Sequence, residues 1–168
     1  MTDWNDPKSM VSQHFSVHEC TYLPSWGCHH APSDEEKANL TRMAAKADEI
    51  RGKLGRPMTI HVWIRPQHLN CPDFDPSTVT VENDPDGKKQ AALDALDYNA
   101  YVGGAGHSAH VLGLAIDYDA GEDCDTTRDT MEPELAPMGL RMERKPGSKW
   151  VHNDVMPVPP GGHAYFIP

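Results

Sequence analysis

The chain has 168 residues, of which 24% are charged and 38% hydrophobic, and this length and balance are those of one ordinary folded domain, expected over residues 1–168. The formal net charge of −10 argues against nucleic acid as a partner. Residues 1–10 are polar where a secretory signal needs an apolar core, and no run is apolar enough to span a membrane, so we expect synthesis in the cytoplasm and no membrane partner.

Cysteines and histidines gather ahead of the first clear helix. The four cysteines of the chain are too widely spaced for a zinc-ribbon pattern, which favours free thiols in a protein made in the cytoplasm. Cys28, His29 and His30, with Cys20 upstream, could instead hold a second metal ion or a structural bridge. No spacing rule decides between these roles.

The strongest predicted element is a helix over residues 33–55. Ser33 and Glu36 fit a capping box at its start, and Gly55 supplies a stop at its end. Apolar residues recur between them at helical spacing, at Leu40, Met43, Ala44, Ala47, Ile50 and Leu54. We expect this apolar stripe to pack on a sheet.

The next elements are a strand, a shorter helix and a second strand. Residues 58–64 are β-branched and aromatic, so they predict a strand with Arg65 at its end. Residues 88–100 predict a helix that closes at the following glycine pair. A further strand is expected over residues 114–119.

The C-terminal third predicts a hairpin. Residues 122–137 have no clear pattern, whereas residues 140–143 and 149–155 flank a turn-forming segment at 145–148. Helices and strands do not alternate regularly along the chain. We therefore predict an α+β fold with a small, mostly antiparallel sheet flanked by helices.

Two histidines and an aspartate are the candidate metal ligands. A hydrolytic zinc needs about three nitrogen or carboxylate ligands and one open position. His110 and Asp117 are seven positions apart, an odd spacing that would put them on opposite faces of a regular strand, so the chain must bend between them, and Gly113 is the natural place. In residues 149–155, alternation sets Trp150, His152 and Asp154 on one face, which makes His152 the third ligand.

A family resemblance strengthens this interpretation. Residues 108–117 match the pattern S-x-H-x-x-G-x-A-x-D, which resembles the zinc motif of D-Ala-D-Ala carboxypeptidases, dipeptidases and phage endolysins related to hedgehog domains. Residues 14–20, 40–55, 60–70 and 150–154 resemble, in order, the opening segment, first helix, arginine-bearing strand and closing W-x-H-x-D segment of that family. The resemblance covers nearly the whole chain and implies a hedgehog or carboxypeptidase-like fold, with Zn²⁺ held by His110, Asp117 and His152.

The general base is the point at which the chain departs from the family. Many members carry a glutamate three residues before the last histidine and others a histidine two before it, whereas this chain has Lys149 and Trp150 there. We predict Asp154 as the base because it shares a strand face with His152, and Glu143 on the neighbouring strand is the second candidate. Asp154 could instead orient the His152 imidazole.

The expected function is zinc-dependent hydrolysis of a peptide bond next to a D-amino acid in peptidoglycan. The resemblance implies that Arg65 binds a substrate carboxylate or a developing oxyanion, with Ser108 and Trp150 as further substrate contacts. A phage lysis or tail-associated peptidase, which reaches the cell wall by release or on a virion, fits the absence of a signal. The alternative is a catalytically inactive zinc-binding structural or interaction module of the same fold, which the Lys149 departure motivates.

Overall fold

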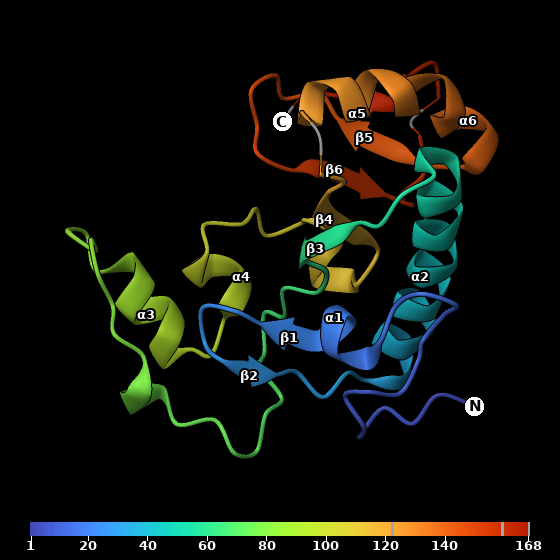
Figure 1. Ribbon diagram of the computed structural model, residues 1–168. Helices are drawn as coiled ribbons and strands as arrows, with labels where there is room; N and C mark the ends of the chain where they lie inside the picture. The colour runs from blue at the N-terminus through green and yellow to red at the C-terminus, as the bar shows by residue number, and fades with distance from the viewer. Residues whose placement is uncertain (122, 159, 168) are drawn as a thin grey trace.

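The computed structural model describes residues 1–121, 123–158 and 160–167, and it has an α+β fold (Figure 1). The helices are α1 Val17–Thr21, α2 Asp34–Leu54, α3 Lys88–Asp94, α4 Tyr98–Tyr101, α5 Cys124–Met131 and α6 Leu135–Met138, with 3₁₀ turns at Pro76–Thr78, Ala109–Leu112 and Glu132–Glu134. The strands are β1 Tyr22–Leu23, β2 Cys28–His29, β3 Thr59–Val62, β4 Ala115–Asp119, β5 Arg141–Glu143, β6 Val151–Asp154 and β7 Tyr165–Phe166. No helix in the described part of the chain is long and apolar enough to cross a membrane.

The main sheet is mixed and has five strands, in the order β3-β4-β6-β5-β7. The first three pairings are antiparallel and only the edge strand β7 runs parallel to its neighbour β5. The hairpin predicted around residues 145–148 is confirmed as β5 and β6. The prediction of a mostly antiparallel sheet with helices is therefore confirmed at the level of fold class.

Helix α2 covers one face of this sheet. The Ser33 hydroxyl accepts from the backbone amide of Glu36, and the Glu36 carboxylate accepts from the backbone amide of Ser33, so the predicted capping box is present. The helix ends at Gly55. The α2 residues that are buried are Leu40, Met43, Ala44, Ala47 and Ile50, which confirms the predicted stripe. They share one hydrophobic core with Ile116 and Tyr118 of β4. Asp117 projects from the opposite face of β4, away from this core, where its carboxylate can contact other polar side chains.

Two predicted segments need correction. The helix expected over residues 88–100 is divided into α3 and α4, because Leu96 adopts a left-handed backbone with φ of 55°, and Asp97 then caps a new helix. The segment 122–137, expected to lack a pattern, contains α5 and α6; its first residue, Glu122, lies outside the described residues. Helix α5 is not predicted by the sequence pattern because its threonines and aspartates are poor helix formers. Its N-cap is Asp123, whose side chain accepts from the backbone amide of Thr126.

Candidate metal centre

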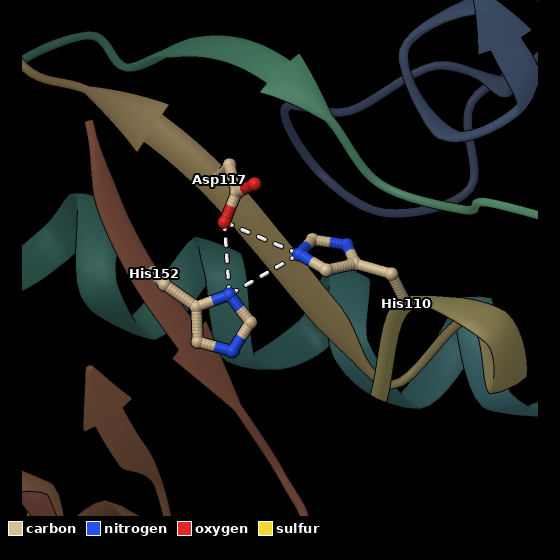
Figure 2. A group of neighbouring side chains, drawn as sticks. All are labelled: His110, Asp117 and His152. Carbon is tan, nitrogen blue, oxygen red and sulfur yellow. Dashed lines mark hydrogen bonds and ion pairs between the residues drawn. The ribbon is translucent and has the colours of Figure 1, made fainter. Parts of the chain in front are cut away.

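His110, Asp117 and His152 meet in front of the sheet, with α2 passing behind the strands in Figure 2. Oδ1 of Asp117 lies 2.8 Å from Nδ1 of His152 and 3.2 Å from Nε2 of His110, and the two nitrogens are 3.1 Å apart. Sheet register explains the meeting, because Asp117 of β4 pairs directly with His152 of β6. Among the described residues, this is the one group of three or more His, Cys, Asp or Glu side chains close enough to hold a metal ion.

The outer hydrogen bonds fix which nitrogen of each ring faces the centre. Nδ1 of His110 lies 2.7 Å from the carbonyl oxygen of Trp63, which can only accept, so this nitrogen carries the proton and Nε2 offers a lone pair. Nε2 of His152 lies 3.3 Å from the Asp154 carboxylate and donates to it. Nδ1 of His152 is therefore free to bind a proton or a metal ion. Three electron-pair donors converge on one point.

The pKa values follow from this crowding. Burial alone would raise the pKa of Asp117, yet the charges and hydrogen bonds of His110 and His152 hold it well below its ordinary value. Burial would lower the pKa of His152, but its hydrogen bonds to Asp117 and Asp154 raise it to about 9. Burial dominates at His110 and lowers its pKa. In the absence of metal, a proton on His152 thus relieves the repulsion among the three donors.

The bend predicted at Gly113 brings His110 to this point. His110 lies in the 3₁₀ turn Ala109–Leu112, which Ser108 caps by accepting from the His110 backbone, and which ends at Gly113 with φ of 70°. A Cβ added to Gly113 would lie 3.1 Å from the Leu40 side chain, so the positive φ favours glycine and a larger residue would also have to displace Leu40. The His110 carbonyl in turn accepts from the backbone of Arg65 at 3.0 Å.

No protein-family model, curated protein or solved structure matches the chain. The geometry by itself supports a coarser statement than a family: a buried group of two histidines and one aspartate that can hold a metal ion. The donor set, rather than a relative, must therefore indicate the metal and the chemistry.

Arg65 faces the centre, as predicted. Its Nη2 donates to Oδ2 of Asp117 at 3.0 Å, on the oxygen that does not face the two histidines. Its Nε is buried and has no hydrogen-bond partner in the part of the chain that the structure describes. An unpaired buried donor is costly, so Arg65 has spare capacity to bind an acceptor that enters the site.

Asp154 occupies the orienting position rather than the base position. Its carboxylate contacts Nε2 of His152, on the side of the ring away from the centre. It also accepts from Nε and Nη2 of Arg141 at 2.8 and 2.9 Å and from the Met156 backbone at 2.9 Å. Burial would raise its pKa, but the bonds from His152 and Arg141 lower it instead. A carboxylate with this many donors is a poor proton acceptor, and the geometry favours the alternative role.

Glu143 gains support as the second candidate base. Met142 pairs with Asn153, so continuing the antiparallel register by one residue sets Glu143 across from His152. Directly opposed residues project from the same face of a sheet. Glu143, His152 and Asp117 therefore form one row across β5, β6 and β4.

The centre lines a cavity of about 840 Å³. Arg65, Ser108, Glu143 and Trp150, all predicted as site residues, line the same cavity, and the Trp150 side chain is 40% exposed at it. Sequence reasoning missed two participants: Arg141, which holds Asp154, and the Trp63 carbonyl, which holds His110. Only the position of Arg141 on the strand facing Asp154 could have indicated the first, and a backbone carbonyl leaves no signal in a sequence.

The N-terminal cysteine and histidine cluster does not assemble a metal site around cysteine. All four cysteines are free, as expected, and Cys20 is buried in the core. His30 is buried and structural, since its Nε2 lies 3.3 Å from the Glu36 carboxylate and its Nδ1 accepts from the Asn70 backbone. His29 pairs instead with His18.

Proposed function

We propose that the chain is a zinc-dependent peptidase of hedgehog or D-Ala-D-Ala carboxypeptidase-like fold that hydrolyses a peptide bond next to a D-amino acid in peptidoglycan. One observation carries the proposal: the lone pairs of His110 and His152 and the Asp117 carboxylate converge within 2.8–3.2 Å of one another. Such an arrangement is repulsive unless a cation or a proton lies among the three donors.

The residues present fit zinc. Ligands held about 2.0–2.1 Å from a tetrahedral metal lie about 3.3 Å apart, close to the donor separations in this site. Two imidazoles and one carboxylate are a catalytic rather than a structural ligand set, since they leave the fourth position open. When bound there, zinc would supply a Lewis acid that acidifies water and polarises a carbonyl.

The chain's own residues divide the remaining work. Arg65 would bind the substrate's terminal carboxylate or the developing oxyanion through its unpaired Nε and its forked geometry. Glu143, in line with His152 on the neighbouring strand, would accept the proton of the attacking water and return it to the leaving amine. Asp154 keeps His152 in the tautomer whose Nδ1 faces the centre.

The peptidoglycan substrate is supported by the motif resemblance of residues 108–117 and 150–154 and by the character of the cavity. Three cationic and three anionic side chains line it, and Trp150 offers a partly exposed apolar wall; the charged residues are Arg65, Arg141, Lys145, Asp117, Glu143 and Asp154. The buried Nε of Arg65, which has no partner among the described residues, is a donor for a single carboxylate that enters the cavity. Stem peptides that end in a D-amino acid have such a carboxylate. A phage lysis or tail protein remains the setting that we propose.

The test is digestion of purified peptidoglycan by the zinc-loaded protein, with the muropeptide fragments weighed by mass spectrometry. The expected result is a new fragment whose mass identifies cleavage beside a D-amino acid, and its loss in His152→Ala. His61→Ala is the matched control, because His61 also lines the cavity and pairs with a carboxylate, Asp119, but is not part of the centre. Stoichiometric zinc binding with no fragment at any enzyme concentration would instead establish the inactive zinc-binding module.

A further inference from the structure

A second pair of imidazoles lies outside the proposed active site, in the N-terminal segment that contains α1, β1 and β2. Nδ1 of His18, on α1, lies 3.2 Å from Nε2 of His29, on β2. The two-stranded pairing of β1 with β2 sets Tyr22 opposite His29, and the turn from α1 into β1 brings His18 to the same place. Neither histidine belongs to the cavity of the metal centre, so the pair has no part in the function proposed above.

The tautomer of His29 is fixed by a buried hydroxyl. Oγ1 of Thr21 donates its one hydrogen to the Val17 carbonyl at 2.8 Å. The same oxygen lies 3.0 Å from Nδ1 of His29, so it must accept there and Nδ1 carries the imidazole proton. Nε2 of His29 is consequently the unprotonated nitrogen, and its lone pair points at His18. Burial, with His18 nearby, also lowers the pKa of His29.

Both rings are held in place by an aromatic neighbour. The Tyr22 ring stacks on His18 with centroids 4.8 Å apart and contacts His29 at 5.2 Å. The backbone is fixed as well, since the amide that follows His29, that of His30, donates to the Thr21 carbonyl at 3.0 Å. The two nitrogens therefore face each other without a large loss of side-chain freedom on binding a ligand.

We propose that His18 Nδ1 and His29 Nε2 form a second metal site, which takes a divalent transition ion of the copper, nickel and zinc group with water in the remaining positions. The nitrogen separation of 3.2 Å is close to the roughly 3.3 Å expected between two ligands about 2.0 Å from one tetrahedral metal. Imidazole nitrogens suit these ions. On metal binding, the proton that His18 Nδ1 donates to His29 Nε2 would move to His18 Nε2, which leaves a lone pair on each ligand nitrogen for the metal ion. Thr21 is the positioning residue that orients the His29 ligand.

The test is a Cu²⁺ titration of the full chain, with affinity measured by calorimetry and the ligand atoms identified by electron paramagnetic resonance. The titration uses a His152→Ala background, which removes one candidate ligand of the other centre. The expected signal shows two nitrogen ligands. His18→Ala and His29→Ala should each weaken Cu²⁺ binding at least tenfold, and Thr21→Val by about 10–100-fold. His14→Ala is the control, because His14 is a comparable surface histidine that pairs with Asp48 rather than with another imidazole.

The inference is overturned if His18→Ala and His29→Ala leave the Cu²⁺ affinity of the folded protein unchanged, or if the resonance shows a single nitrogen. Circular dichroism of each variant establishes that it is folded. His18 is exposed, so His18→Ala in particular leaves the core intact and keeps the test valid if Thr21→Val destabilises the protein. The result is independent of peptidoglycan hydrolysis, which can fail while this site binds metal.

Discussion

Replacement of Asp154 by asparagine separates the two roles that a carboxylate beside a ligand histidine can have. The side chain is 1% exposed and accepts from His152, from two Arg141 nitrogens and from the Met156 backbone. Asparagine has one acceptor oxygen instead of two and brings an NH₂ group. If that group takes the place of Oδ2, it opposes Nη2 of Arg141 and donates to Nε2 of His152, so the imidazole proton moves to Nδ1, the atom that faces the centre. If it takes the place of Oδ1, it opposes Nε of Arg141 and the Met156 amide.

The structure sets the size of the effect. Loss of a partner that orients a ligand histidine lowers metal affinity by about 10–100-fold, which is about 1.4–2.7 kcal/mol. The ion pair with Arg141 is lost as well; because the Arg141 side chain is 21% exposed and the asparagine keeps one acceptor, we expect metal-free stability to fall by about 1–3 kcal/mol rather than by the larger cost of a fully buried pair.

Zinc affinity is measured by competition with a chelator, and stability by urea unfolding in the presence of a strong chelator. Asp119→Asn is the matched control, because Asp119 also bonds a histidine ring nitrogen, on His61 at 3.0 Å, but does not contact the centre. It should leave zinc affinity within about twofold of the parent, in line with small effects of surface substitutions. Unchanged zinc affinity in Asp154→Asn together with lost turnover would refute the orienting role and restore Asp154 as the base.

Four other outcomes are expected. Glu143→Gln should keep zinc and lower the turnover number by about 10²–10⁴-fold, measured on muropeptides; unchanged turnover would remove Glu143 as the base. Arg65→Ala should raise KM for a carboxylate-terminated substrate by about 10–100-fold relative to its amide, and Arg65→Lys should not restore it. Gly113→Ala should destabilise the protein by about 1–3 kcal/mol in urea unfolding, and more than Gly147→Ala, which has a similar φ of 74° but no neighbour within 4 Å. The metal-free protein should lose stability as pH rises from about 6.5 through about 9, because the pKa of His152 is raised in the folded state to about 9; saturating zinc should abolish that slope.

Much of the fold could be predicted because local signals agreed with tertiary ones. The sequence pattern predicted both the capping box of Ser33 and Glu36 and the apolar stripe of α2. The turn-forming residues 145–148 predicted the β5–β6 hairpin. The signals failed where backbone conformation, not periodicity, decided the outcome. The positive φ of Leu96 divides α3 from α4, and no composition rule predicts a left-handed leucine.

The three candidate metal ligands were predicted from the resemblance of residues 108–117 and 150–154 to the zinc motif, and strand parity added only the requirement for a bend. The odd spacing of His110 and Asp117 demanded a bend, and Gly113 provides it with a left-handed backbone beneath Leu40. The general base could not be assigned from the strand pattern. Residues two apart on a strand share a face, but alternation does not fix which ring nitrogen of a histidine its neighbour contacts. Asp154 shares the face of His152 as predicted, yet it contacts the ring nitrogen that points away from the centre.

The register of the β5–β6 hairpin decides which carboxylate is the better candidate base, because it sets the positions of both Arg141 and Glu143 relative to β6. Arg141 lies opposite Asp154 and bonds its carboxylate, and two residues along each strand the same register would bring Glu143 level with His152. A slip of one residue would turn both side chains to the other face of β5, toward the hydrophobic core. The buried Met142 between them resists that slip, because it would then be turned out to the cavity. The methionine that anchors β5 to the core is thus what sets a carboxylate in line with Asp117 and His152, and this row across three strands is the arrangement from which hydrolytic chemistry would follow.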